Sequence, residues 1–157
     1  MNKKGFTLME LLIVVIIISG FAIMTYPSYK VSLERARASE AVNMLGAIQA
    51  AQQKHFVNYE EYASTFHGIN DFEPGINGFD PSLSHFDTEF FKYGIISGQK
   101  KAQALRAKNG NPINKGYRLE ALFEDRFIRC IVLTTEGEKV CSSLTDKAKV
   151  ENYYPIF

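Results

Sequence analysis

The sequence lacks the local motifs that mark most enzymes and metal proteins. It contains neither a phosphate-binding G-x-x-x-x-G-K-[ST] loop nor a G-x-S-x-G nucleophile turn. The three histidines (His55, His67 and His85) are scattered, and the two cysteines do not form a C-x-x-C pair. Asp146 and Glu151 alone do not supply the cluster of oxygen ligands that calcium requires. We therefore expect a protein that is not an enzyme and has no metal or cofactor.

Net charge is also nearly absent, because the sequence has 18 basic and 17 acidic residues, which gives a formal charge of +1. Overall charge therefore favours no particular partner. Charge is rarest near the N-terminus, where Glu10 is the only charged residue from Phe6 to Tyr26. At about 1.5 Å per residue, a helix over this stretch would just cross the hydrocarbon core of a bilayer. The composition predicts a membrane segment.

The position of Glu10 in this segment needs an explanation. A carboxylate in a bilayer-facing helix costs roughly 2.5 to 3.5 kcal/mol, and such residues usually have a functional partner. The nearby cations, Lys3 and Lys4, precede the apolar run. If the chain were cut after Gly5, the new amino group of Phe6 would lie one turn from Glu10. An amine is disfavoured at a helix N-terminus and a carboxylate is favoured there, so the two groups would complement each other.

The string KKGFTLMELLIVVIII, with Gly5 before Phe6 and a glutamate five positions after Gly5, resembles the class III leader of the type IV pilin family. The resemblance implies that a prepilin peptidase cuts between Gly5 and Phe6 and methylates the Phe6 amine. It also implies that Glu10 meets the Phe6 amine of an adjacent subunit during assembly. The expected partners are identical or related pilin subunits and the pilus assembly machinery. The chain would cross the inner membrane once before assembly and lie in an extracellular filament afterwards.

Two plainer interpretations of this segment are possible from the sequence. An ordinary secretory signal would be cleaved near Gly20-Phe21-Ala22. A simple single-span anchor would carry a separate head. Both leave Glu10 without a purpose, so the retained assembly helix is the favoured interpretation.

Helical patterning continues beyond the apolar run. Pro27 removes a backbone hydrogen bond and predicts a kink or hinge, although it could instead end the membrane span. In pilins a proline stands at this same place, which implies that Pro27 is that hinge. Residues that are apolar except for Gln52 then recur at three- and four-residue steps and predict one buried face: Ala38, Ala41, Val42, Leu45, Ile48, Gln52 and Phe56.

The sequence predicts an α+β protein with four parts: a leader (1–5), a hydrophobic helix (6–29), an amphipathic helix (30–58) and a head (59–157). An irregular loop of about 63–89 should open the head, pinned by Phe66, Phe72, Phe79 and Phe86. Strands are expected at 90–97, 116–123, 127–134 and 138–143. The aromatic tail 152–157 should pack on the sheet edge. This arrangement, a long N-terminal helix on a small antiparallel sheet, is the type IV pilin fold.

The segment 99–118 contains no acidic residue. Its turn signal Asn109-Gly110-Asn111-Pro112 favours a flexible solvated loop. The alternative is a surface for DNA or another anion, since lysine and arginine bind phosphates with release of counterions. Its candidate residues are Lys100, Lys101, Arg106 and Lys108.

Cys130 and Cys141 flank the expected hairpin turn at 135–137. A two-residue loop would place them opposite each other, whereas a three-residue loop ending in Gly137 would offset them. A bulge or a strand break near Cys141 would resolve this conflict. Many pilins have a disulfide near the C-terminus, and we expect one here; free buried cysteines are the alternative.

The resemblance implies a structural subunit of a type IV pilus, or fimbrium. A pseudopilin of a type II secretion system is the alternative within the same superfamily. The basic segment leaves a third interpretation, a minor pilin that binds DNA or surfaces. The sequence does not separate roles in motility, cell adhesion or DNA uptake.

Overall fold

The computed structural model describes residues 6–69, 72, 74–75, 80, 82–108 and 111–156. Within these residues the α-helices are α1 (Leu8–Tyr59) and α2 (Thr135–Leu144). The short 3-10 turns are η1 (Phe66–Gly68) and η2 (Ser97–Gln99). The strands are β1 (His85–Asp87), β2 (Phe91–Ile96), β3 (Lys101–Lys108), β4 (Asn111–Pro112), β5 (Tyr117–Leu122), β6 (Phe127–Val132) and β7 (Tyr153–Pro155). The chain divides into two compact units, Met1–Glu34 and Arg35–Phe157, which are described separately below.

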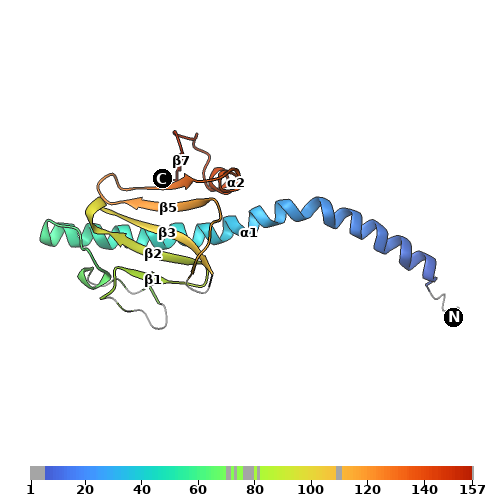
Figure 1. Ribbon diagram of the computed structural model, residues 1–157, viewed down its shortest axis with the longest axis horizontal. Helices are drawn as coiled ribbons and strands as arrows, with labels where there is room; N and C mark the ends of the chain where they lie inside the picture. The colour runs from blue at the N-terminus through green and yellow to red at the C-terminus, as the bar shows by residue number, and fades with distance from the viewer. Residues whose placement is uncertain are drawn as a thin grey trace, which may run out of the picture. The chain divides into compact units, whose positions relative to one another are not determined.

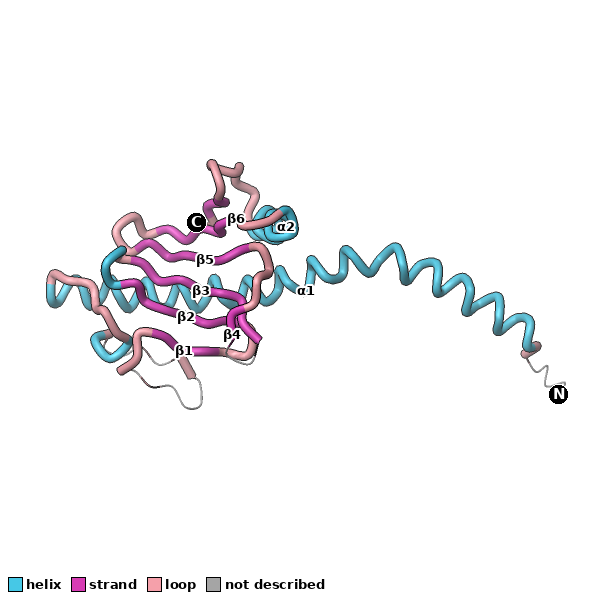
Figure 2. The backbone as a smooth tube through the Cα atoms, viewed as in Figure 1, coloured by secondary structure: helices cyan, strands magenta, loops and turns pink. Residues whose placement is uncertain are grey.

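The second unit is built on one antiparallel sheet in the order β1-β2-β3-β5-β6-β7, with β4 paired to β3 (Figure 1). Its central strands pair along their length, with Phe91 opposite Arg106 and Ala121 opposite Ile128. Figure 2 shows the part of α1 that belongs to this unit lying across one face of the sheet. A long N-terminal helix packed on an antiparallel sheet confirms the predicted α+β fold class.

The predicted apolar stripe of α1 forms the helical side of the core. Six of its members are buried: Ala38, Ala41, Val42, Leu45, Ile48 and Gln52. The core continues into small residues on β3 and β5, including Ala102, Ala104 and Ala121. The prediction is wrong for Phe56, which is 39% exposed and stacks on Tyr62 at 4.7 Å between ring centroids. Helix α1 ends at Tyr59, so Phe56 lies where the helix leaves the core.

Three glutamines join α1 to the rest of this unit. Gln52 is fully buried; its Nε2 donates to the Ala63 carbonyl at 2.9 Å, and its Oε1 accepts from the Ala63 amide at 2.9 Å. Gln49 and Gln53 donate from Nε2 to the carbonyls of Leu122 and Phe123. Their spacing places the three side chains on neighbouring positions of the helix, where they satisfy backbone groups of the loop after α1 and of the end of β5.

Replacing Gln52 by leucine is expected to lower the free energy of unfolding by about 2–4 kcal/mol, because two buried backbone groups of Ala63 lose their partner. Gln53→Ala is the matched control, with an expected loss below about 1 kcal/mol, because water can reach the half-buried group it leaves. Urea unfolding of the full chain in a non-ionic detergent, followed by near-ultraviolet circular dichroism, measures both. Equal midpoints for the two variants would contradict the role assigned to Gln52.

The loop before the sheet is held by its aromatic residues, as predicted. Phe66, Phe72 and Phe86 are each less than 10% exposed. The Phe66 ring lies 5.5 Å from that of Phe72 and 4.9 Å from that of Phe86. Phe79 lies outside the described residues. A continuous aromatic cluster therefore closes one end of the core.

The strand predicted at 138–143 is wrong, because these residues belong to helix α2. Thr134 caps the helix, its side-chain oxygen accepting from the Gly137 amide at 3.3 Å, and Glu136 and Glu138 lie in the first turn, where acids are favoured. Gly137, Val140, Cys141 and Leu144 recur at helical spacing and pack inward. That spacing was a readable helix signal.

Gly137 does not form the predicted hairpin turn. It lies on α2, where its lack of a side chain allows close packing against Gly116. A Cβ atom at Gly137 would collide with the carbonyl oxygen of Gly116. Gly116 itself has a φ of +75°, a conformation that suits glycine. Two glycines thus allow the first turn of α2 to touch the start of β5.

The flexible loop predicted over 99–118 is also wrong. Most of this segment forms β3, a central strand of the sheet, followed by β4. Asn109 and Gly110 lie outside the described residues. The aromatic tail forms β7 and pairs with β6, so the expected packing of the tail on the sheet edge is confirmed for Tyr153–Pro155. Phe157 is not described.

Candidate functional site

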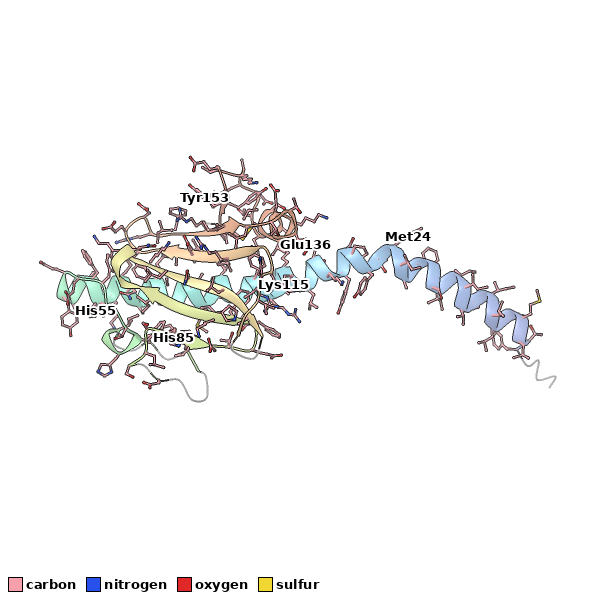
Figure 3. All side chains as sticks on the ribbon, viewed as in Figure 1. Met24, His55, His85, Lys115, Glu136 and Tyr153 are labelled. Atoms are coloured by element: carbon pink, nitrogen blue, oxygen red, sulfur yellow. A yellow bond between two sulfur atoms is a disulfide. The ribbon has the colours of Figure 1, made fainter. Side chains whose placement is uncertain are left out.

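The first unit carries a continuous apolar surface. Its large apolar side chains between Phe6 and Tyr29 are exposed, from 47% for Ile13 to 92% for Leu8. Side chains stand out around the helix near Met24 (Figure 3). This part of α1 is long and apolar enough to cross a membrane by length and composition. An apolar surface of this size requires a lipid or protein environment.

The hydroxyl groups of this segment are satisfied within the helix. Ser19 Oγ donates to the Val15 carbonyl at 2.6 Å, and Thr25 Oγ1 donates to the Phe21 carbonyl at 3.2 Å. Such bonds to the preceding turn satisfy the hydroxyl donors of these two residues without water. Ser19 and Thr25 are therefore compatible with lipid.

Glu10 forms a reciprocal cap with Thr7 at the start of α1. Its Oε2 accepts from the Thr7 amide and from the Thr7 hydroxyl, both at 2.8 Å, while Thr7 Oγ1 accepts from the Glu10 amide at 3.2 Å. This is a capping box, in which a threonine and a glutamate three positions later satisfy each other's backbone donors. The T-x-x-E spacing in the sequence is a signal for this cap.

The cap changes the interpretation of Glu10. A carboxylate in an apolar segment predicts a nearby cation, yet Thr7 already supplies two donors to Glu10 Oε2. Among the described residues, no hydrogen bond reaches Oε1. The carboxylate is thus held in one orientation by its own chain, and its second oxygen is left for another group.

The predicted cleavage and hinge residues lie at the two ends of the apolar segment. Phe6 is 87% exposed, while Gly5 lies outside the described residues. Pro27 lies inside α1, which is helical on both sides of it, so the hinge stays a prediction. Lys30 Nζ lies 4.3 Å from the centre of the Tyr26 ring, and Tyr29 is 63% exposed. Tyrosine and lysine at the end of an apolar run are typical of a membrane–water boundary.

Cys130 and Cys141 form a disulfide with a Cα–Cα distance of 5.5 Å, which confirms the expected bond. Both cysteines are fully buried. The bond joins β6 to α2, and the conflict between loop length and pairing disappears because Cys141 lies on a helix rather than on a strand.

Of the four basic residues proposed as an anion surface, the three whose side chains are described do not converge. Arg106 is only 4% exposed, and its guanidinium carbon lies 5.1 Å from the centre of the Phe91 ring on the core side. Lys101 lies on the opposite face of β3, with Nζ 3.1 Å from Glu120 Oε1. Lys100 Nζ lies 2.5 Å from Glu124 Oε1, and this bond raises the pKa of Lys100. The side chain of Lys108 is not described.

Strand pairing instead gathers a different set of charges, which we call the outer-face cluster: Lys101, Arg118, Glu120 and Arg129. Leu119 and Ala121 face the core, so the alternating neighbours Arg118 and Glu120 point to the other face of the sheet. Arg129 donates to Glu120 Oε2 from Nε at 3.0 Å and from Nη2 at 2.8 Å. Arg118 Nε lies 3.2 Å from Glu120 Oε1.

Glu120 stays ionised although its side chain is only 1% exposed. Burial alone would raise the pKa of this carboxyl. The hydrogen bonds from Arg129 and Lys101, and the charges of Lys101 and Arg118, outweigh that effect and lower the pKa below its ordinary value of 4.5.

Glu120→Gln is expected to lower the free energy of unfolding at neutral pH by about 3 kcal/mol, because three cations lose their buried counter-charge. A carboxyl with a lowered folded-state pKa stabilises the fold above pH 4.5, and this contribution is lost as the pH falls through the folded-state value. Urea midpoints between pH 7 and pH 3 should therefore fall less steeply in Glu120→Gln than in the wild type. Glu124→Gln, at an exposed ion pair, is the control with little expected effect. Parallel curves for the wild type and Glu120→Gln would refute the assignment.

No group of three histidine, cysteine, aspartate or glutamate side chains is placed to hold a metal ion within the described part of the chain. His55, His67 and His85 lie on three different elements, α1, η1 and β1.

A family model for the prokaryotic N-terminal methylation motif matches residues 1–26. A fimbrial protein of Neisseria meningitidis serogroup A / serotype 4A is 36% identical over 62 residues, which cover 40% of this chain and 36% of the relative. A fimbrial protein of N. meningitidis serogroup B is 35% identical over 60 residues, or 38% of this chain and 35% of the relative. Fimbrial protein EcpC of Eikenella corrodens is 39% identical over 54 residues, or 34% of this chain and 35% of the relative.

These matches cover about a third of the length of the curated relatives. The motif and the fimbrial relatives support a similarity of this chain to the type IV pilin family. The fold of the second unit, a helix packed on an antiparallel sheet, agrees with that similarity.

Proposed function

We propose that this chain is a structural subunit of a type IV pilus-like filament and assembles through the apolar part of α1. The observation that carries the proposal is the exposed apolar surface from Phe6 to Met24, which contains one carboxylate, Glu10. Before assembly the segment would cross the inner membrane once. After assembly, in the extracellular filament, it would pack among the same segments of identical or related subunits.

Processing would prepare the N-terminus for this packing. A prepilin peptidase would cut between Gly5 and Phe6 and methylate the Phe6 amine, and the methylation motif matched at residues 1–26 supports this step. Glu10 Oε1 would then accept the amine of a neighbouring Phe6, while Thr7 keeps Oε2 and holds the carboxylate in place. An ion pair in this apolar setting would set the axial register of the subunits, because an uncompensated charge there is costly. The pilus assembly machinery would move each subunit from lipid into the filament.

Mass spectrometry of the mature chain tests the processing step. We expect a chain that begins at methylated Phe6. A mature chain beginning after Ala22 would refute the proposal, because Glu10 and most of the apolar surface would be lost. A chain that keeps Gly5 would refute peptidase processing.

The abundance of the chain in sheared filaments tests the pilus role itself. A pilus subunit is recovered in the sheared fraction in an amount that matches the filament mass. Recovery only in the membrane fraction, with normal processing, would instead favour a secretion pseudopilin.

A further inference from the structure

The outer-face cluster has more positive than negative charge. Lys101, Arg118 and Arg129 surround a single acid, Glu120, which is ionised at neutral pH. The other ion pair described on this face, Lys92 with Asp87 at 3.7 Å, is balanced. The cluster therefore carries two positive charges that no described acid of the same face offsets.

The three cations differ in how strongly the protein already uses them. Arg129 is committed to Glu120 by two hydrogen bonds, and its guanidinium carbon lies 5.2 Å from the centre of the Tyr153 ring on β7, which is labelled in Figure 3. Lys101 donates one hydrogen bond to Glu120 and is 14% exposed. The Nε atom of Arg118 is buried and makes no hydrogen bond to any described residue despite its approach to Glu120, but the Arg118 side chain as a whole is 38% exposed, the most of the three cations. Arg118 is thus the cation best able to bind another group.

The charges are concentrated rather than spread along a line. A nitrogen of each basic side chain lies within 3.2 Å of the same carboxylate. Duplex DNA presents one charge about every 1.7 Å along its axis, so a nucleic-acid surface needs cations along a stripe. A compact set of two arginines and a lysine suits one oxyanion group, since the planar guanidinium donates two parallel hydrogen bonds to phosphate-type oxygens.

We propose that the outer-face cluster binds a single tetrahedral oxyanion, a phosphate or sulfate group, through Arg118 with Lys101 and Arg129 beside it. The fixed geometry of the cluster supports this assignment, because Glu120 and the Tyr153 ring hold Arg129 in place before any ligand arrives. The site lies on the face of the sheet opposite α1, and it does not depend on the proposed filament role.

Thermal unfolding of the full chain in a non-ionic detergent at pH 7 tests the site. Inorganic phosphate and inorganic sulfate are titrated against sodium chloride at equal ionic strength. A ligand that binds only the folded state raises Tm along a saturating curve, whereas the general salting effect of these anions has no saturation. We expect a saturating component in the wild type and at least a tenfold weaker apparent affinity in Arg118→Gln. Arg126→Gln, at an exposed turn arginine, is the matched control and should respond as the wild type does.

A second variant and a second ligand make the result decisive. Arg118→Lys keeps the charge and loses the planar fork, so it should fold normally and bind more weakly than the wild type. A sulfated heparin disaccharide is added as a separate arm; tighter binding than inorganic sulfate would assign the site to a sulfated sugar, and equal binding would assign it to the free ion. A wild-type response without saturation, or an equal saturating response in Arg118→Gln, would overturn the proposal.

Discussion

A chain carrying Glu10→Val as the sole subunit is expected to insert into membranes at least as well as the wild type and to form no normal filaments. Removing the carboxylate lowers the cost of placing the helix in lipid. It also removes the acceptor proposed for the Phe6 amine of a neighbouring subunit. Membrane fractionation and the yield of sheared filaments measure the two effects separately.

The capping box makes it necessary to separate the charge of Glu10 from its structural role. Glutamine can replace glutamate at this position of a capping box, so Glu10→Gln keeps a side-chain acceptor for the Thr7 amide while it loses the charge. We expect Glu10→Gln to fail in assembly nearly as completely as Glu10→Val. Glu61→Gln, at an exposed acid of the second unit, should assemble normally. Wild-type filaments from Glu10→Gln would show that the cap, and not the ion pair, is what assembly requires.

Loss of the disulfide is the second change with a large expected effect. The double variant Cys130→Ala/Cys141→Ala should lose about 3 kcal/mol of unfolding free energy, because a closed loop of this size restricts the unfolded chain by about that amount. The bond joins a fully buried residue of β6 to a fully buried residue of α2, so α2 should loosen first when the bond is lost. Urea unfolding followed by near-ultraviolet circular dichroism measures the loss.

Reduction provides the internal control for this prediction. A reductant should shift the wild-type midpoint toward that of the double variant and should leave the double variant unchanged. An unchanged wild-type midpoint after complete reduction would mean that core packing alone holds α2 in place. The double variant has no free thiol in the core, because both cysteines are replaced by alanine. The difference between its midpoint and that of the oxidised wild type therefore reports only on the crosslink and the lost sulfur contacts.

Several features could be read from the sequence because short-range patterns specify them. A long apolar run with one acid, followed by residues repeating at three and four positions, requires a helix whose first part is apolar all round and whose second part has one buried face. The strands at 91–96, 117–122 and 127–132 were visible as runs of aromatic and β-branched residues. The Thr7–Glu10 cap belongs to the same class, since its two members are three residues apart.

Other features depended on packing between distant segments. The sequence 135–144 has both a helix-compatible pattern and a glycine that signals a turn. The contact of Gly137 with Gly116 and the disulfide to β6 favour the helix. Arg106 and Lys101 belong to one basic run, yet the pairing of β3 with its neighbours directs Arg106 to the core and Lys101 to the outer face. The outer-face cluster exists only because β3, β5 and β6 lie side by side. The charge of each residue can be read from the sequence. The counter-charge beside it depends on which strand is its neighbour, and only the tertiary structure determines the neighbouring strand.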